Sequence, residues 1–258
     1  MNVLKIICAI LILLFIPACG SGIAATEPPV PSNTAIPSPA PTNTPLPPPT
    51  STPIPPTPTP EFLQYYTEEF EKDLKYWPYF IINGRTSVIQ NDPVEKVTMS
   101  AEGGFFKFDI EKTGFWVYST YDPFDYEDVR IDARMDNLGT NDNYISLVCR
   151  YSKENGWYEF NIANSGLYTI YFAKPREDGY VNYAVIIDGG SNKIKQGLEV
   201  NEYTAICEGD NLSLFINGNL TKEVKDTQLT SGKVGISVSS FLNLPVKVNV
   251  DWIKISQP

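Results

Sequence analysis

The feature that most constrains this chain is an alternation of apolar and polar residues with a period of two. From Val129 to Asp136 every second residue is apolar, and the residues between are charged. Leu212, Leu214 and Ile216 likewise occupy alternate positions, directly before Asn217-Gly218, a dipeptide typical of a tight hairpin turn. No window shows a convincing apolar period of 3.6 residues over three helical turns. The sequence therefore predicts an all-β domain, an antiparallel sandwich of about twelve strands.

Composition separates a linker from a folded domain. Residues 28–60 hold fifteen of the 22 prolines and no charged residue. Proline removes backbone donors and fixes φ, so this segment cannot build a packed core and favours polyproline II. Its 33 residues would reach about 100 Å if fully extended. We therefore expect a Pro/Thr-rich linker over residues 19–60 and one domain with a sizeable core over residues 61–258.

The N-terminus predicts export. An apolar run follows Lys5, and small residues precede Cys19. Residues 14–20, Leu-Phe-Ile-Pro-Ala-Cys-Gly, resemble the lipobox of bacterial lipoproteins, in which the cysteine is lipidated and becomes the first residue of the mature chain. The resemblance implies a signal peptide over residues 1–18, lipidation of Cys19, and a place on the extracytoplasmic side of a bacterial cell membrane. The alternatives are an ordinary secretory signal and an uncleaved anchor.

Charge and composition exclude several functions. The formal net charge is -10, and the basic residues are scattered, so the chain lacks the clustered Lys and Arg that bind nucleic acid. The chain has no His, which excludes Ser-His and Cys-His nucleophile pairs and His metal ligands. Any catalysis would rest on carboxylates, Lys, Tyr or a bound metal.

Two of the four cysteines remain for the exported domain. Cys8 lies in the predicted signal peptide and Cys19 at the lipidation site, which leaves Cys149 and Cys207. An oxidising exterior favours a disulfide between them. Two buried thiols that pack as small hydrophobes are the alternative.

The segment from Tyr144 to Ala173 predicts a sheet with two different faces. If residues 164–166 form a three-residue hairpin loop with Gly166 in the left-handed conformation, Asn161 lies opposite Thr169. Residues 145, 147, 149 and 151 should then point into the core, together with Tyr158, Phe160, Ile162, Tyr168, Ile170 and Phe172. The opposite face would carry a polar, aromatic and charged set: Arg150, Trp157, Glu159, Asn161 and Tyr171.

The domain resembles the concanavalin A-like lectin/glucanase superfamily, near the 3-keto-disaccharide hydrolase-like and laminin G-like domains. The resemblance covers nearly all of residues 61–258 and rests on ordered blocks: Glu68-Glu69-Phe70 with Trp77, Val129 to Ala133, Leu147 to Tyr151, Trp157 to Phe160, Cys207 to Asp210, Leu212 to Gly218, Gly232 to Gly235, and Val250-Asp251-Trp252. It implies a jelly roll of two antiparallel sheets, one curved into a shallow groove. Sugars in this superfamily commonly lie in that groove or on the loops at its rim.

The polar face indicates carbohydrate binding. Pyranose rings pack their C–H surface on indole and phenol rings, and their hydroxyls need planar donors and acceptors. Arg150, Trp157, Glu159, Asn161 and Tyr171 supply both. The alternative is that these residues face solvent for β propensity alone, with Arg150 and Glu159 as a weak surface pair.

Catalysis finds less support in the sequence than binding does. Laminarinase-type members of the superfamily carry Glu-x-Asp-x-(x)-Glu on one strand, and this chain lacks that motif. The nearest acidic cluster spans residues 68–73, and Asp132 and Asp136 lack a clear catalytic partner. Glu69 and Asp251 alone do not make a calcium site, so we predict no metal and no cofactor. The expected function is a non-catalytic module that binds a glycan or another cell-surface partner. A glycoside hydrolase and a structural protein-binding domain remain as alternatives.

Overall fold

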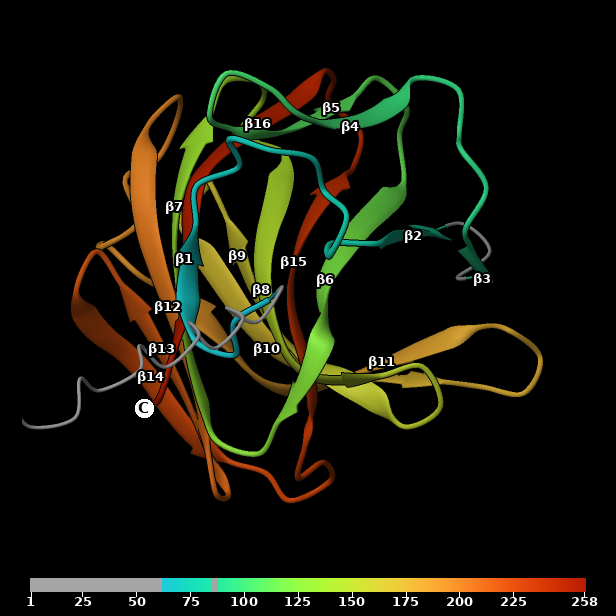
Figure 1. Ribbon diagram of the computed structural model, residues 1–258. Coiled ribbons are helices and arrows are strands. Elements are labelled where there is room, and N and C mark those ends of the chain that lie inside the picture. Colours follow the sequence, from blue (N-terminus) through green and yellow to red (C-terminus); the bar gives the residue numbers. More distant parts are fainter. Residues whose placement is uncertain (1–61, 85–87) are drawn as a thin grey trace, which may run out of the picture. The chain divides into compact units, whose positions relative to one another are not determined.

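The computed structural model describes residues 62–84 and 88–258, which form sixteen β-strands and no α-helix. Two antiparallel sheets of eight strands each pack face to face (Figure 1). This architecture confirms the predicted all-β sandwich of jelly-roll type, although it has sixteen strands instead of about twelve. The predicted signal peptide, the lipidation site at Cys19 and the linker over residues 19–60 lie outside the described residues. The described part holds no helix that is long and apolar enough to cross a membrane.

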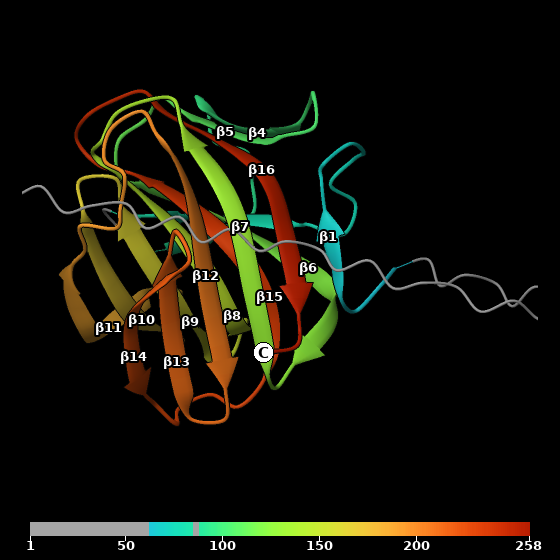
Figure 2. The ribbon, with the colours of Figure 1, turned by 90° about the vertical axis from the view of Figure 1, so that its left-hand side faces the viewer.

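The first sheet, here sheet A, has the strand order β14-β13-β12-β7-β16-β5-β4, and β1 pairs with β16 at its side. In Figure 2 this sheet lies in front of the other. Its strands are β1 (Tyr66–Glu68), β4 (Val97–Ala101), β5 (Phe106–Ile110), β7 (Val129–Asn137), β12 (Val200–Glu208), β13 (Asn211–Ile216), β14 (Asn219–Lys225) and β16 (Val246–Ser256).

The second sheet, sheet B, has the order β11-β10-β9-β8-β15-β6-β2-β3. Consecutive strands β8 to β11 form a meander, whereas β15 enters between β8 and β6 from the far end of the sequence. The strands are β2 (Tyr79–Asn83), β3 (Val88–Gln90), β6 (Phe115–Tyr126), β8 (Asn143–Ser152), β9 (Gly156–Ala163), β10 (Leu167–Pro175), β11 (Val181–Gly190) and β15 (Gly232–Ser240).

The core lies between the sheets and follows the alternation of the sequence. On β7 the apolar residues of the 129–136 segment are buried, and the charged residues between them are only partly covered. Leu212, Leu214 and Ile216 are likewise buried, and Asn217 and Gly218 both adopt positive φ in the turn between β13 and β14. The pattern of period two thus determined both the strands and their buried faces.

The hairpin of β9 and β10 has the predicted register. Asn161 lies opposite Thr169, and Gly166 adopts a φ of 103° in the loop. The inward residues of these two strands belong to the core between the sheets, except that Phe172 is only partly buried against it. Glycine is needed at position 166 because side chains disfavour this φ.

A disulfide joins the two sheets. Cys149 on β8 and Cys207 on β12 are bonded, with their Cα atoms 6.7 Å apart. This is the pair that remains when the two N-terminal cysteines are set aside. The bond connects the centre of sheet B with sheet A across the core, where both cysteines are fully buried.

Candidate functional site

The outer face of sheet B carries its own aromatic layer. Phe80 and Tyr118 stack with ring centroids 4.8 Å apart, and Trp157 packs against both. Tyr183 of β11 packs edge to face with Trp157, so a ring from the edge strand of sheet B joins this layer. This second buried cluster lies on the opposite side of sheet B from the core between the sheets.

Trp157, Glu159 and Asn161 do share this outer face, but they are buried. Trp157 is fully buried, Glu159 is 1% exposed and Asn161 is 4% exposed. The expectation of an open polar face was therefore wrong at these positions. The physical reason is tertiary, because rings from β2, β6 and β11 cover residues that alternation alone assigns to solvent.

Arg150 does not share the face with Glu159, so that expectation is also wrong. The pairing of β8 with β9 shifts between Cys149 and Ser152, and Arg150 adopts a φ of 53° in this bulge. The guanidinium is buried and donates to the backbone carbonyls of three other segments: Glu127, Gly209 and Leu229.

The bulge also reverses the face of the next residue. Tyr151, predicted to point into the core, instead packs on the outer face beside Phe80, with ring centroids 5.2 Å apart. One extra residue in a strand inverts the alternation beyond it, which explains both errors.

A cavity of about 300 Å³, here the aromatic pocket, opens on this face. Three of the five predicted ligand-binding residues line it: Glu159, Asn161 and Tyr171. Tyr171 is partly exposed on β10, next to Tyr183. The other lining residues are aromatic: Trp116, Tyr144, Tyr183 and Phe241.

These four aromatic residues were not among those predicted from the sequence. Trp116 and Tyr118 share one parity on β6, opposite to the core residue Val117, and this alternation was the available signal. Tyr183 and Phe241 had no comparable signal, because only the folded sheet brings β11 and the end of β15 beside β6. Phe241 contacts both Trp116 and Tyr144 edge to face.

A hydrogen-bond network holds the carboxylate of Glu159. Oε2 accepts from the Tyr118 hydroxyl at 2.7 Å and from the Trp157 indole at 3.2 Å. Oε1 accepts from the Ser146 hydroxyl at 2.9 Å and from the Asn161 amide at 3.2 Å. All four neighbours donate, so each oxygen of the buried carboxylate accepts two hydrogen bonds. Charge-assisted bonds of this kind compensate for burial.

The two tyrosines of this network keep their protons. Burial and then the charge of Glu159 raise the pKa of Tyr118 well above its ordinary value. The same two causes raise the pKa of Tyr183, whose hydroxyl lies 2.8 Å from that of Tyr118. Both hydroxyls therefore stay protonated, and their hydrogen bonds persist, well into the alkaline range.

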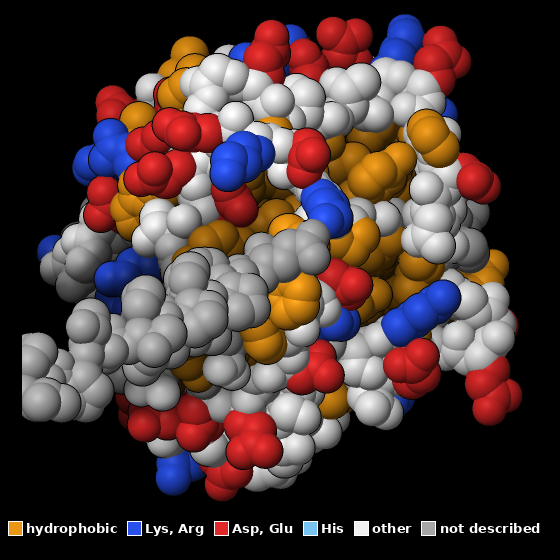
Figure 3. Space-filling view, viewed as in Figure 1, with side chains coloured by type: hydrophobic (Ala, Val, Ile, Leu, Met, Phe, Trp, Pro, Cys, Tyr) orange, Lys and Arg blue, Asp and Glu red, His pale blue; other side chains and the backbone are white. Residues whose placement is uncertain are grey.

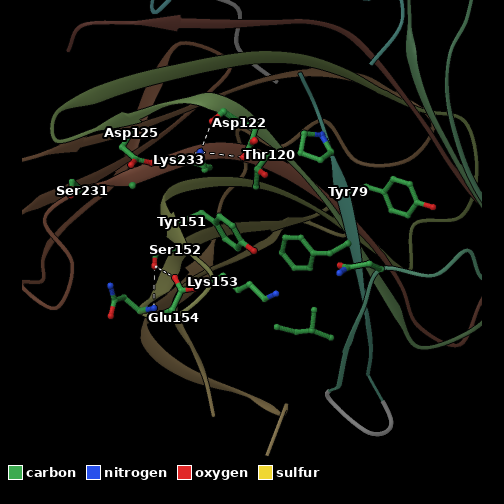
Figure 4. A pocket seen from close by; sticks show the side chains of 16 residues that line it. Tyr79, Thr120, Asp122, Asp125, Tyr151, Ser152, Lys153, Glu154, Ser231 and Lys233 are labelled. Atoms are coloured by element: carbon green, nitrogen blue, oxygen red, sulfur yellow. Dashed lines mark hydrogen bonds and ion pairs between the residues drawn. The ribbon is translucent and has the colours of Figure 1, made fainter. Parts of the chain in front are cut away.

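A second hollow, here the Lys233 cleft, lies on the same side of the molecule and has a volume of about 510 Å³. Figure 3 shows hydrophobic side chains gathered in a hollow between β2 and β11, with charged side chains at its rim. In Figure 4, Lys233 lies between Asp122 and Asp125, at 3.1 Å and 3.9 Å. These ion pairs neutralise much of its charge. None of the five predicted ligand-binding residues lines this cleft.

The acidic residues considered for catalysis lie away from both hollows. Asp132 on β7 accepts a two-pronged hydrogen bond from Arg130 and a third bond from Thr204. Glu68 accepts from the backbone of Phe70 at the side of sheet A. Among residues 62–84 and 88–258, no group of three or more acidic or Cys side chains gathers in a way that could hold a metal ion.

Comparison with known proteins identifies the fold. No protein-family model matches the chain, and no curated protein sequence matches it. Solved structures do match. The mixed linkage glucan GH16 protein of Bacteroides ovatus, solved with the product G4G4G3G, has a TM-score of 0.53 and 12% identity, over 74% of this chain and 99% of that one.

Two further structures show the same likeness. A β-glucanase from Bacillus licheniformis has a TM-score of 0.52 and 11% identity, over 77% of this chain and 100% of that one. LamAcat from Zobellia galactanivorans has a TM-score of 0.51 and 11% identity, over 74% and 96%. At these identities the likeness establishes the architecture alone: the described domain has the concanavalin A-like jelly-roll fold of these proteins.

Proposed function

We propose that this chain is a lipid-anchored, extracytoplasmic protein whose jelly-roll domain binds a glycan without hydrolysing it. The observation that carries the proposal is the aromatic pocket, where Trp116, Tyr171 and Tyr183 surround the amide of Asn161 and the fixed carboxylate of Glu159. Aromatic walls suit the C–H face of a sugar ring, and the planar amide of Asn161 suits its hydroxyls. The lipobox-like N-terminus supports the anchored location.

The fold relatives give this proposal a context. Their names describe a β-glucanase and a mixed linkage glucan protein, so the same architecture acts on polysaccharides elsewhere. Fold alone does not determine function, and the argument therefore rests on the pocket.

The pocket supports binding better than hydrolysis. Retaining and inverting glycosidases normally need two carboxyl groups on opposite sides of the scissile bond. Among the described residues that line the pocket, Glu159 has the only carboxylate, and both its oxygens already accept hydrogen bonds from protein donors. Glu159 is therefore placed to orient its neighbours.

The test is a binding screen with the full chain in detergent, against a broad panel of polysaccharides and oligosaccharides. Tyr171→Ala and Trp116→Ala should each lower affinity about tenfold, because each removes a stacking surface. Tyr180→Ala is the matched control, since Tyr180 is exposed in the turn between β10 and β11 and does not line the pocket.

Three results would contradict the proposal. Release of reducing sugar would establish the glycoside hydrolase alternative. Binding that is unchanged in both pocket variants would place the ligand elsewhere. Failure to bind any glycan would favour the alternative of a protein-binding surface domain.

A further inference from the structure

Glu159 takes up the donors of Asn161 and, through Tyr118, that of Tyr183, so these two groups of the aromatic pocket offer acceptors to a ligand. Asn161 uses one amide hydrogen on Ser146 Oγ at 3.1 Å and the other on Glu159 Oε1 at 3.2 Å. The orientation of the amide follows from this network, since its two donors meet two acceptors. Asn161 Oδ1 has no hydrogen-bond partner among the described residues, and Asn161 lines the pocket.

The hydroxyl of Tyr183 is also oriented by this network, so that its oxygen acts as an acceptor toward the pocket. The single hydroxyl proton of Tyr118 is donated to Glu159 at 2.7 Å, so Tyr118 can only accept from Tyr183. The proton of Tyr183 is therefore spent on Tyr118, which leaves the lone pairs of its oxygen for other partners. Two polar groups of the pocket, Asn161 and Tyr183, thus need donors from whatever binds.

The negative charge of the pocket also favours neutral ligands over anions. Glu159 is the one charged side chain among its described lining residues, and no Lys or Arg lies in that lining. Among the described residues Glu159 forms no ion pair, and its four partners are all uncharged donors. An anion in this small, partly enclosed cavity would meet a like charge at low effective dielectric.

We infer that the aromatic pocket selects sugars that supply hydroxyl donors and carry no negative charge, and that Glu159 is the positioning residue that sets this selectivity. The inference rests on the proposed function and names its ligand class: neutral glycans are accepted, and hexuronates and sulfated sugars are rejected. The discrimination arises from two causes, the orientation of Asn161 and Tyr183 and the charge of Glu159. Buried polar groups that are left without partners impose strong discrimination of this kind.

The first test compares matched ligands on the unmodified full chain. Neutral glucose, galactose and mannose oligosaccharides are measured beside the same oligosaccharides oxidised at C6 to uronates. At least one neutral series should bind at least about 100-fold more tightly than its uronate form. Equal or tighter binding of the uronates would overturn the inference and leave glycan binding intact. Failure of every member to bind would overturn the proposed function itself, and the inference with it.

The second test reverses the network with Glu159→Gln. The Gln oxygen can still accept from Tyr118 and Trp157, but its amide nitrogen would then face the Asn161 amide as donor against donor. The Asn161 amide should therefore rotate and present its nitrogen to the pocket. We expect the preference for neutral over uronate ligands to fall at least tenfold.

The control variant is Glu177→Gln, an exposed carboxylate in the turn between β10 and β11. It should keep the full preference, and near-UV circular dichroism should show that Glu159→Gln retains its packing. An unchanged preference in a folded Glu159→Gln protein would overturn the role of Glu159. If that variant does not fold, the methyl esters of the uronates decide on the unmodified chain: they carry no charge and should recover most of the lost affinity, whereas esters that bind as weakly as the free uronates would overturn the inference.

Discussion

At the scale of a single residue, Arg150 links separate backbone segments through the hydrogen bonds of its guanidinium. Its guanidinium reaches the carbonyls of Glu127, Gly209 and Leu229, which belong to three different connections between strands. Arg150→Ala would leave these carbonyls without their donors in a buried site. We expect the free energy of unfolding to fall by about 3 kcal/mol or more, measured by urea denaturation.

The matched control is Arg176→Ala, because Arg176 is 60% exposed and its contacts, an ion pair with Asp178 and a cation–π contact with Tyr180, lie at the surface. That change should stay within about 0.5 kcal/mol of the unmodified protein. Equal losses in the free energy of unfolding for the two substitutions would show that the hydrogen bonds of Arg150 do not stabilise the fold.

For individual residues, the sequence predicted the face of the sheet that a side chain occupies better than whether that side chain is exposed. Glu159, Asn161 and Tyr171 share a face as expected, because the length of the hairpin loop and the period of two determine the register. The burial of Glu159 and Asn161 could not be predicted, because only the folded sheet brings the rings of β2, β6 and β11 over this face. The position of Arg150 was missed because a bulge leaves no mark in a pattern of apolar residues.

At the scale of elements, the close approach of β9 and β10 depends on glycine. Gly156 begins β9 with a φ of 101°, and a Cβ atom there would lie 2.1 Å from the carbonyl oxygen of Ala173 on β10. Gly103 has a φ of 65°, but nothing lies within 4 Å of its Cβ position. Substitution of Gly103 would therefore introduce backbone strain alone, whereas substitution of Gly156 would add a steric clash.

Gly156→Ala should destabilise the protein considerably more than Gly103→Ala. For Gly103→Ala we expect a loss of about 1 kcal/mol from positive φ alone. For Gly156→Ala we expect more than about 3 kcal/mol, since β9 or β10 must also move. Thermal denaturation of both variants measures the difference, and similar melting temperatures would argue against the close approach of β9 and β10.

The number of strands was underestimated because some strands are too short to be recognised in the sequence. The strands β1 and β3 have three residues each, which is too few to show an alternation. The long strands β7, β9 and β10 follow the period of two, and β9 and β10 supply Glu159, Asn161 and Tyr171.

At the scale of the whole molecule, the disulfide ties sheet B to sheet A across 58 residues of sequence. A cross-link over this length restricts the unfolded chain and stabilises the fold by about 4 kcal/mol. The double variant Cys149→Ser/Cys207→Ser should lose that amount in urea denaturation. A reducing agent should destabilise the unmodified protein by a similar amount and leave the double variant unaffected. Insensitivity of the unmodified protein to reduction would contradict a stabilising role for the bond.

Buried tyrosines should make the whole fold sensitive to alkaline pH. Burial raises the pKa of Tyr203, and burial together with Glu159 raises that of Tyr118, both well above the ordinary value of about 10. Burial is also the largest cause that raises the pKa of Tyr151 and of Tyr158 to about 12. Above pH ~10 the unfolded chain releases these protons, whereas the folded protein retains them.

The sign follows from this difference in bound protons. The stabilisation is complete below pH ~10 and is lost as the pH rises toward the raised pKa values of the folded state. Tyr118 and Tyr203 are fully buried, and each should steepen the loss by about 1.4 kcal/mol per pH unit. Urea denaturation at about pH 9 and about pH 11 measures the slope, and phenolate absorbance follows ionisation. Tyr203→Phe keeps the ring and removes the hydroxyl, so the free energy of unfolding should fall less steeply with pH, by the contribution of one tyrosine. Full ionisation of the tyrosines in a protein that is still folded at about pH 11 would refute the raised pKa values.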